Sequence, residues 1–526
     1  MRDRKADTLI ILTCLFFIVV VIYPIGSMLL KMKDVDIIMI WTSTRFLTAL
    51  KNSVILSVAA TIISVSLAFS LAWCIERSNI KFKNIIKVMV TLPMLIPSIS
   101  HGMGLVILFG SNGVVTNFFG VEWNIYGEVG IIIGSVMYSF PVAFLMMADI
   151  FKYEDGNAYQ AAEVLGIPRW SQFIRITGSY IRKPMVSVIF ATFSLIVTDY
   201  GVSLFVGGKC ITLPVVMYQD VIGQLDFGKG SAIGVILLLP AVLAFIIDMM
   251  SQDKGNNNNK QVEYQICNNK LRDVLCYMYC ILMAFVVILP IITFAVLSFV
   301  KKYPIDLSLT MEHINRIFGM SGGKYLLNSV LIALIVAFLG VVMGFASAYL
   351  TVRMKTKASY LLHLLSIVSL AIPGIVLGLS YVIAFKKWPI YGTFVIIVMV
   401  NLIHFFSSPY LMMYNTLGKI NHSLEAVGKT LGIGRWHIVK DIIIPQVKDT
   451  AIEMFSYFFV NCMMTISAVS FLVTMKTKTI SLMITQFEAQ MMIECSAFVS
   501  LIILVVNLLM KYILHTVQCK QWQGNR

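Results

Sequence analysis

Long apolar stretches alternate with short polar stretches along most of this chain. About twelve of the apolar stretches reach the length of roughly twenty residues that a helix needs to cross a bilayer. Their approximate bounds are 9–30, 52–76, 87–110, 129–151, 184–207, 230–250, 272–299, 326–351, 359–385, 389–415, 449–474 and 496–515. The pattern predicts an all-α membrane protein with about twelve transmembrane helices.

The polar stretch 251–271 is the longest interruption of this pattern, and it contains four consecutive asparagines. It predicts a linker between a first half, 1–250, and a second half, 272–526, each with six spans. Prolines within four spans (Pro97, Pro141, Pro373 and Pro409) predict breaks or bends in those helices.

The two halves are copies of one another. Asn52-Ser53-Val54 recurs 276 residues later as Asn328-Ser329-Val330, and Arg77 and Pro97 recur at the same offset as Arg353 and Pro373. Leu-Gly-Ile-x-Arg-Trp occurs at 165–170 and again 266 residues later, at 431–436. Six spans per copy give both copies the same orientation, which predicts two parallel six-helix repeats.

Composition and charge agree with a membrane location. Of the 526 residues 58% are apolar and only 13% are charged, which is too little charge for a water-facing surface. The net charge of +15 would suggest nucleic acid in a soluble protein, but 27 of the 41 lysines and arginines lie in the alternate, predicted inner segments. This positive-inside bias predicts that both termini and the linker are cytoplasmic, and it leaves no reason to expect a nucleic-acid partner.

Two predicted inner loops, 153–183 and 417–447, carry the clearest functional signal. Each predicts a short helix, a glycine stop and a second amphipathic helix. Gly166 and Gly432 suit the left-handed residue that ends a helix. Pro168 suits the start of the next helix, where the second copy has Gly434. A polar loop on the membrane surface would explain one such segment, but not its recurrence at the same place in both repeats.

These loops resemble the EAA motif of the membrane subunits of binding-protein-dependent ABC importers. The resemblance covers nearly the whole chain and is strongest to the fused, two-copy permeases for ferric iron, thiamine and 2-aminoethylphosphonate. It implies a duplicated MetI-like permease fold in the inner (plasma) membrane of a bacterium. It also implies an ABC ATPase subunit, in two copies, and an extracytoplasmic solute-binding protein as partners besides the lipid bilayer.

In that family the loop is a coupling helix that sits in a groove of the ATPase. The resemblance assigns this role to Gln160, Ala161, Ala162, Gly166, Arg169, Glu425, Ala426, Val427, Gly428, Gly432, Arg435 and Pro445. Two departures stand out. The motif's acidic position holds Gln160 in one copy and Ala426, beside Glu425, in the other, and Pro445 is replaced by Ser179 in the first copy.

No catalytic or metal-binding residues are predicted. Gly428-Lys429-Thr430 lacks the upstream glycine of a phosphate-binding loop, and the linker is too short for a nucleotide-binding domain. We therefore expect no cofactor on this chain, no enzymatic activity of its own, and ATP and Mg²⁺ only in the partner ATPase.

Polar groups inside the spans are candidates for a substrate path because they are costly in lipid. Asp199 is the strongest, and Thr198, Tyr200, Asn461 and Ser467 accompany it. A lone carboxylate suits a cationic or amine-bearing solute, but an interface residue that reaches outer water or caps the helix explains it equally well. Aminoethylphosphonate, ferric iron, thiamine and polyamines all remain open as solutes.

Two other classes of protein compete with the importer. A major-facilitator-type secondary transporter also has twelve spans in two parallel halves, but its usual loop motif after the second span is not matched by 76–81. A membrane receptor or scaffold leaves the duplicated loops unexplained.

Overall fold

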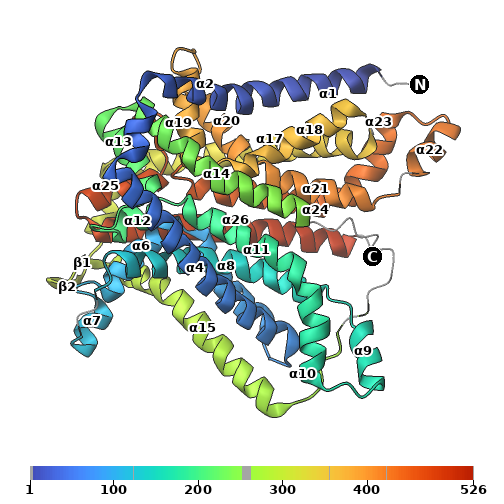
Figure 1. The fold of residues 1–526 in the computed structure, drawn as a ribbon, viewed down its shortest axis with the longest axis horizontal. Helices are drawn as coiled ribbons and strands as arrows, with labels where there is room; N and C mark the ends of the chain where they lie inside the picture. The colour runs from blue at the N-terminus through green and yellow to red at the C-terminus, as the bar shows by residue number, and fades with distance from the viewer. Residues whose placement is uncertain are drawn as a thin grey trace. The chain divides into compact units, whose positions relative to one another are not determined.

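A computed structural model describes residues 4–121, 124–251, 262, 264–354, 356–421 and 423–524. These residues are mostly helical (Figure 1), and the one sheet among them is a two-stranded antiparallel hairpin of β1 (Val300–Lys302) and β2 (Asp306–Leu309). The predicted all-α membrane fold is confirmed.

The helices form two compact units, each assembled from separate parts of the chain. The first contains Met1–Ile38, Tyr218–Leu238 and Met311–Arg526, and the second contains Met39–Met217 and Leu239–Thr310. We call them unit 1 and unit 2. Helices α13 (Leu213–Gln224) and α14 (Phe227–Ser251) are divided between them, and α3 (Ile37–Thr42) crosses the first boundary.

Unit 2 is built on the long helix α4 (Thr44–Arg77), which packs lengthwise against α8 (Glu128–Lys152). The remaining helices of this unit are α5 (Lys83–Thr91), α6 (Ser98–Phe109), α7 (Val114–Phe119), α9 (Asn157–Val164), α10 (Arg169–Gln172), α11 (Gly178–Val197), α12 (Gly201–Val206) and α15 (Lys270–Leu297). One of its apolar cores lies between α4, α5, α8, α11 and α15.

Unit 1 repeats this plan around α17 (Gly322–Arg353), which packs against α21 (Ser407–Lys419) and α24 (Ile444–Met464). Its other helices are α1 (Arg4–Phe17), α2 (Tyr23–Lys31), α16 (Glu312–Gly319), α18 (Lys357–Ile367), α19 (Gly374–Phe385), α20 (Phe394–His404), α22 (Ser423–Thr430), α23 (Arg435–Ile438), α25 (Ser481–Ala489) and α26 (Ile493–Gly524).

The first span of each repeat belongs to the unit that holds the rest of the other repeat. Helix α1 packs against α17 and α18 of the second repeat, and α2 packs against α19. Helix α15, the first span of the second repeat, packs in the corresponding way against α4, α5 and α6. Cys276, Cys280 and Ala284 of α15 are buried in the unit 2 core. The compact units therefore do not follow the order of the chain.

The described residues contain nine helices that are long and apolar enough to cross a membrane, and two further bent pairs bring the number to eleven. The bends are 111° between α18 and α19, where Pro373 interrupts the span, and 53° between α20 and α21. The stretch expected at 449–474 accounts for the difference from about twelve. Its helix α24 ends at Met464 and carries Lys448, Asp449 and Glu453 in its first half.

Candidate functional site

Both predicted coupling loops fold as a short helix that ends at a left-handed glycine. Helix α9 is followed by Gly166 at φ +66°, and α22 is followed by Gly432 at φ +70°. The amide of Ile167 donates to the carbonyl of Ala162, and that of Ile433 donates to Gly428. These bonds across the glycine close the helix ends in the same way in both copies.

The second helix of each loop widens into a π-helical turn. The turns span Phe173–Thr177 and Val439–Ile443, and the 266-residue offset of the repeat superimposes them residue for residue. Pro445 follows the second turn, whereas Ser179 holds this position in the first copy, so the proline is not needed for the π turn. Such turns are rare and are often found at functional sites.

Small residues bring the two helices of each loop into contact. A Cβ atom on Gly428 would come within 2.3 Å of the Ile438 side chain. In the first copy the equivalent positions are Ala162 and Gln172, both buried, and the Gln172 amide donates to the Ile167 carbonyl at 2.7 Å. Ala162 and Gly428 are among the residues that the resemblance assigns to ATPase coupling, and within this chain they face the second helix of their own loop.

The rest of each loop presents an apolar surface to solvent. Val164 and Trp170 are 89% and 73% exposed in the first copy, and Leu431 and Trp436 are 68% and 70% exposed in the second. Of the residues predicted to couple to an ATPase, the exposed ones are Gln160, Ala161, Gly166, Arg169, Val427, Gly432 and Pro445. Ala162 and Gly428 are buried and Glu425 is partly buried, while the side chains of Ala426 and Arg435 lie outside the described residues.

A buried ion pair fixes the first loop to the end of α4. The guanidinium of Arg77 pairs with Glu154, and both side chains are almost fully buried. The Tyr159 hydroxyl, on α9, donates to the other oxygen of Glu154 at 2.6 Å and also contacts the Thr177 hydroxyl of the π turn. Burial and the hydrogen bond to Glu154 raise the pKa of Tyr159 above its usual range, so this tyrosine stays neutral.

The second loop is fixed by the same arginine position with different partners. Arg353 lies 3.7 Å from the carboxylate of Glu425, on α22, and donates to the Ile420 carbonyl at 3.3 Å. Tyr349 also donates to Glu425, at 3.0 Å. In the repeat, Tyr159 corresponds to Glu425, so the two copies have different side chains at the position that approaches the arginine.

The ion pairs of these two arginines were not predicted from the sequence, although the sequence contained a signal for them. Arg77 and Arg353 mark the repeat, but no role followed from that, and Glu154 and Tyr159 were not singled out. The available signal was a basic residue repeated at the inner end of a span. Carboxylates in the next inner loop could have been expected to pair with it.

The predicted substrate-path residues lie where two spans break. Helix α11 ends at Val197 and α24 ends at Met464, which lie within one residue of each other at the 266-residue offset of the repeat. Irregular backbone at membrane depth is tolerated where protein buries it or where it lines a cavity. Asn52 donates to the Ile211 carbonyl after the first break, and Asn328 donates to the carbonyls of Lys476 and Lys478 after the second. The repeated asparagine therefore holds the chain after each break.

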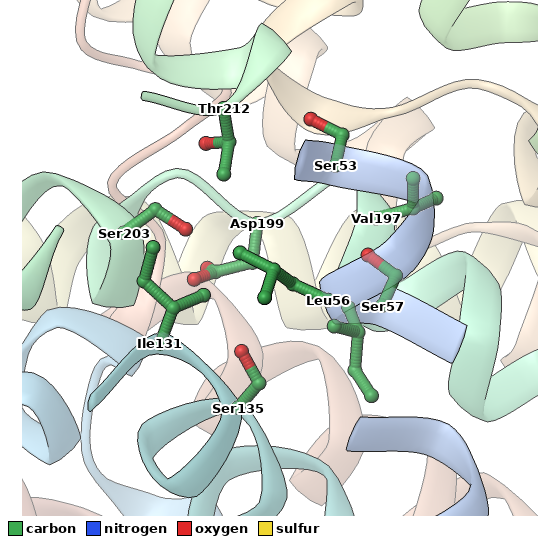
Figure 2. Close-up of a pocket in the computed structure, with 10 residues that line it drawn as sticks. Ser53, Leu56, Ser57, Ile131, Ser135, Val197, Asp199, Ser203 and Thr212 are labelled. Carbon is green, nitrogen blue, oxygen red and sulfur yellow. The ribbon is translucent and has the colours of Figure 1, made fainter. Parts of the chain in front are cut away.

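Asp199 lies at the first break, beside a small polar cavity. Figure 2 shows its carboxylate between the hydroxyls of Ser203 and Ser135, which are turned toward it. The cavity measures about 10 Å³, close to the room that one water molecule needs. The carboxylate accepts the Val202 amide at 3.0 Å, which caps the first turn of α12. The other lining residues are Ser53, Leu56, Ser57, Ile131, Ile196, Val197 and Thr212.

The other four candidates have local partners or are buried. Thr198 and Asn461 donate to carbonyls of their own helices, Ser194 and Tyr457, both at 2.8 Å. Tyr200 is almost completely buried. The Ser467 hydroxyl lies 2.5 Å from the place a Cβ would take on Gly374, so these two elements touch closely. The structure brings Thr198, Asp199 and Tyr200 together in unit 2 and places Asn461 and Ser467 in unit 1.

The duplicated loop and broken span agree with a comparison with known protein families. The model "Binding-protein-dependent transport system inner membrane component" matches residues 64–252 and 340–518, more than half of the chain. The chain belongs to this permease family. It is therefore a two-copy, multi-pass membrane permease of the binding-protein-dependent ABC importer class, and not a major-facilitator-type transporter or a scaffold.

Relatives of this permease align either with most of the chain or with about half of it. The ferric transport system permease protein FbpB of Actinobacillus pleuropneumoniae is 26% identical over 498 residues, which cover 89% of this chain and 71% of that protein. The sulfate transport system permease protein CysT of Escherichia coli K12 is 21% identical over 257 residues, 46% of this chain but 90% of its own length. A solved bacterial alginate ABC transporter, in complex with an alginate pentasaccharide-bound periplasmic protein, aligns with 48% of this chain and 93% of its own at 17% identity and a TM-score of 0.39.

Proposed function

We propose that this permease couples solute import to a separate ATPase through its two loops, α9–α10 and α22–α23. The observation that carries the proposal is the repeated loop itself: a helix closed by a left-handed glycine, a π turn and an exposed tryptophan at the same place in both repeats. Exposed apolar side chains beside a polar rim are typical of protein docking surfaces. Two loops of one kind fit two copies of the ATPase, which would bind the ATP and Mg²⁺.

In this proposal the loops transmit movement between the ATPase and the spans. The ion pair of Arg77 and Glu154 connects the first loop to α4, and Arg353 and Glu425 connect the second loop to α17. Because each arginine lies at the end of a long helix, a displacement of either loop is passed to that helix. Approach of the two ATPase subunits would then move the two sets of spans and alternate access to the path.

The transported solute is proposed to be small and polar and to arrive on a solute-binding protein at the outer face. Asp199 favours a cationic or amine-bearing solute, and a ferric-iron relative agrees with that choice. The cavity beside Asp199 holds only about one water, so solute would reach this carboxylate only after the surrounding helices move apart. Aminoethylphosphonate, thiamine and a polyamine remain alternatives with an amine or a cationic ring.

Co-expression with an ABC ATPase subunit and reconstitution in proteoliposomes test the coupling. We expect the ATPase to co-purify with this chain, and uptake of ferric iron from a loaded binding protein to require ATP inside. Each of the other candidate solutes is measured in the same way. Uptake that follows an imposed proton or sodium gradient without ATP would contradict the proposal, as would an ATPase that never binds the chain.

The proposed orientation places the loops and both termini in the cytoplasm of a bacterial cell. Two natural cysteines test it, because Cys519 is exposed near the end of α26 and Cys210 is partly exposed after the first span break. In variants that keep only one cysteine, a membrane-impermeant maleimide should label Cys210 in intact cells. Cys519 should react only in inverted vesicles, and the reverse result would contradict the orientation.

A further inference from the structure

The linker between the two halves is bound to the first coupling loop. Val262 and residues 264–268, here named the linker strap, lie along the start of this loop in unit 2. The Gly156 amide donates to the Val262 carbonyl at 2.8 Å, and the Val262 amide donates to the Asp155 carboxylate at 3.4 Å. The strap therefore pairs with the loop backbone just before α9 begins.

The strap also covers the charged pair that anchors the loop. The guanidinium carbon of Arg77 lies 3.8 Å from the ring centre of Tyr264, closer than to the rings of Phe151 and Tyr159 at 5.7 and 5.6 Å. Tyr264 meets the ring of Tyr159 edge to face at 4.7 Å. A ring stacked on a desolvated guanidinium is attracted to it, and it keeps water away from the ion pair beneath.

Three further contacts extend the strap to its neighbouring helices. Cys267 lies 3.6 Å from the Glu163 carboxylate of α9, and its carbonyl accepts from Arg272 of α15 at 2.7 Å. Asn268 accepts from Asn79, which follows α4, at 3.3 Å. The strap thus joins the coupling helix to the ends of α4 and α15.

Helix α9 needs such support. It has eight residues, far fewer than the dozen or more that an isolated helix needs in water. Its hold on the Arg77–Glu154 pair runs through the neutral hydroxyl of Tyr159. In the second copy the carboxylate of Glu425 lies on α22 itself and meets Arg353 directly. Helix α9 therefore reaches Arg77 through a neutral hydroxyl and Glu154, whereas α22 carries its carboxylate itself, and the strap is an additional contact on α9.

We propose that the linker strap is a working part of the first coupling loop, in which Tyr264 acts as a positioning residue that holds α9 against the Arg77–Glu154 pair. The proposal rests on the proposed function of the loops and extends it, because it makes the segment that leads into α15 support the coupling loop of the first repeat.

Hydrogen exchange on the purified full chain in lipid nanodiscs tests the contact without any ATPase. In Tyr264→Ala the amides of α9 should exchange about tenfold faster than in the wild type, while those of α22 should not change. Tyr264→Phe keeps the ring over Arg77 and should restore slow exchange. Wild-type exchange in the alanine variant, or fast exchange in the phenylalanine variant, would overturn the proposal.

Two controls separate the strap from general destabilisation and from chain connectivity. Tyr349→Phe, which removes the hydroxyl bound to Glu425, should affect α22 and leave α9 at the wild-type rate. A chain cut at a protease site placed between Gly255 and Asn259 keeps Tyr264 attached to α15, so α9 should still exchange slowly. Acceleration of α9 by either change would overturn the assignment to the strap.

The functional result is measured on the assembled complex with its ATPase. Tyr264→Ala should lower the ATP hydrolysis stimulated by a loaded binding protein several-fold, and Tyr264→Phe should recover it. Loss of slow exchange in α9 with unchanged stimulation would overturn the coupling role of the strap. If the wild-type chain binds no ATPase although its α9 exchange responds as expected, the proposed function of the loops fails and the structural role of Tyr264 stands.

Discussion

The hydroxyl of Ser53 accepts the backbone amide of Leu213 at 2.8 Å, and the second repeat reproduces this bond at 2.8 Å between Ser329 and Ile480. In both repeats the side-chain amide of the preceding asparagine donates to a backbone carbonyl of the same returning segment. The repeated Asn-Ser pair is therefore a clamp on the chain that follows each broken span.

Removing the clamp should destabilise the protein. In Ser329→Ala the buried Ile480 amide loses its partner, which costs about 1–3 kcal/mol, and Ser53→Ala should act alike. Thermal unfolding of the detergent-solubilised chain measures the loss. Ser66→Ala is the matched control, because that hydroxyl is exposed and bonds only within its own helix. Equal melting temperatures for all three variants and the wild type would show that the clamp does not contribute to stability.

The left-handed glycines should be needed for coupling, not for insertion. Replacing Gly166 and Gly432 with valine forces a branched residue into φ near +70°, at a cost of at least about 1–2 kcal/mol per site. Space is not the reason, since a Cβ at either position meets nothing within 4 Å. Co-purification with the ATPase and ATP-dependent uptake should fall while membrane insertion is retained.

Asparagine provides the control for these glycines because it tolerates the left-handed region. The Gly166→Asn and Gly432→Asn double variant should keep most of the activity. If the double valine variant still imports solute with ATP, the loops do not couple in the way proposed.

The packing of α22 against α23 in the second loop should depend on the size of the side chains at positions 428 and 438. Gly428→Leu places a side chain where only 2.3 Å separates a Cβ from Ile438, so α22 must move away from α23. Loss of ATPase binding is expected. Ile438→Ala in the same chain makes room and should restore part of the binding, whereas Ile438→Ala alone should do little. An absence of interaction in this double-mutant cycle would contradict the packing.

Two substitutions of Asp199 distinguish its hydrogen bond to the first turn of α12 from a role in transport. Asparagine keeps an oxygen that can accept the Val202 amide, whereas alanine removes it at a cost of about 1 kcal/mol. Asp199→Asn should therefore keep the melting temperature and lower the uptake of a cationic solute. Asp199→Ala should lower both. Normal uptake by the asparagine variant would leave Asp199 as a cap alone.

Glu488 on α25 should make stability depend on pH. Burial raises the pKa of this carboxyl to about 7, while the unfolded chain keeps the ordinary lower value. The folded state therefore holds a proton that the unfolded state has lost, and this group's stabilisation, complete below about pH 4.5, declines until the pH passes 7. Glu488→Gln should raise the melting temperature at pH 8 by a few degrees relative to the wild type and change it little at pH 5. A constant difference at both pH values would contradict this.

The sequence alone determined much of this protein, because its signals are local or repeated. Apolar stretches of sufficient length specify helices in lipid, where every backbone amide must be paired within its own segment. The positions of Gly166 and Gly432 specify helix ends, because few residues other than glycine adopt a left-handed backbone without cost. The two offsets of the repeat indicated a duplication, the resemblance of the loops indicated a permease, and the family match confirmed both.

Only the tertiary structure showed what the repeated polar residues contact. The Asn-Ser pair and Arg77 were visible as repeats, but their partners lie some 75 to 160 residues away, and no periodicity predicts such contacts. The tertiary structure also placed α15 against the first repeat and brought Tyr264 onto Arg77. Apolar helices in lipid have no hydrophobic preference for one neighbour over another, so shape and scattered polar contacts decide which of them pack together.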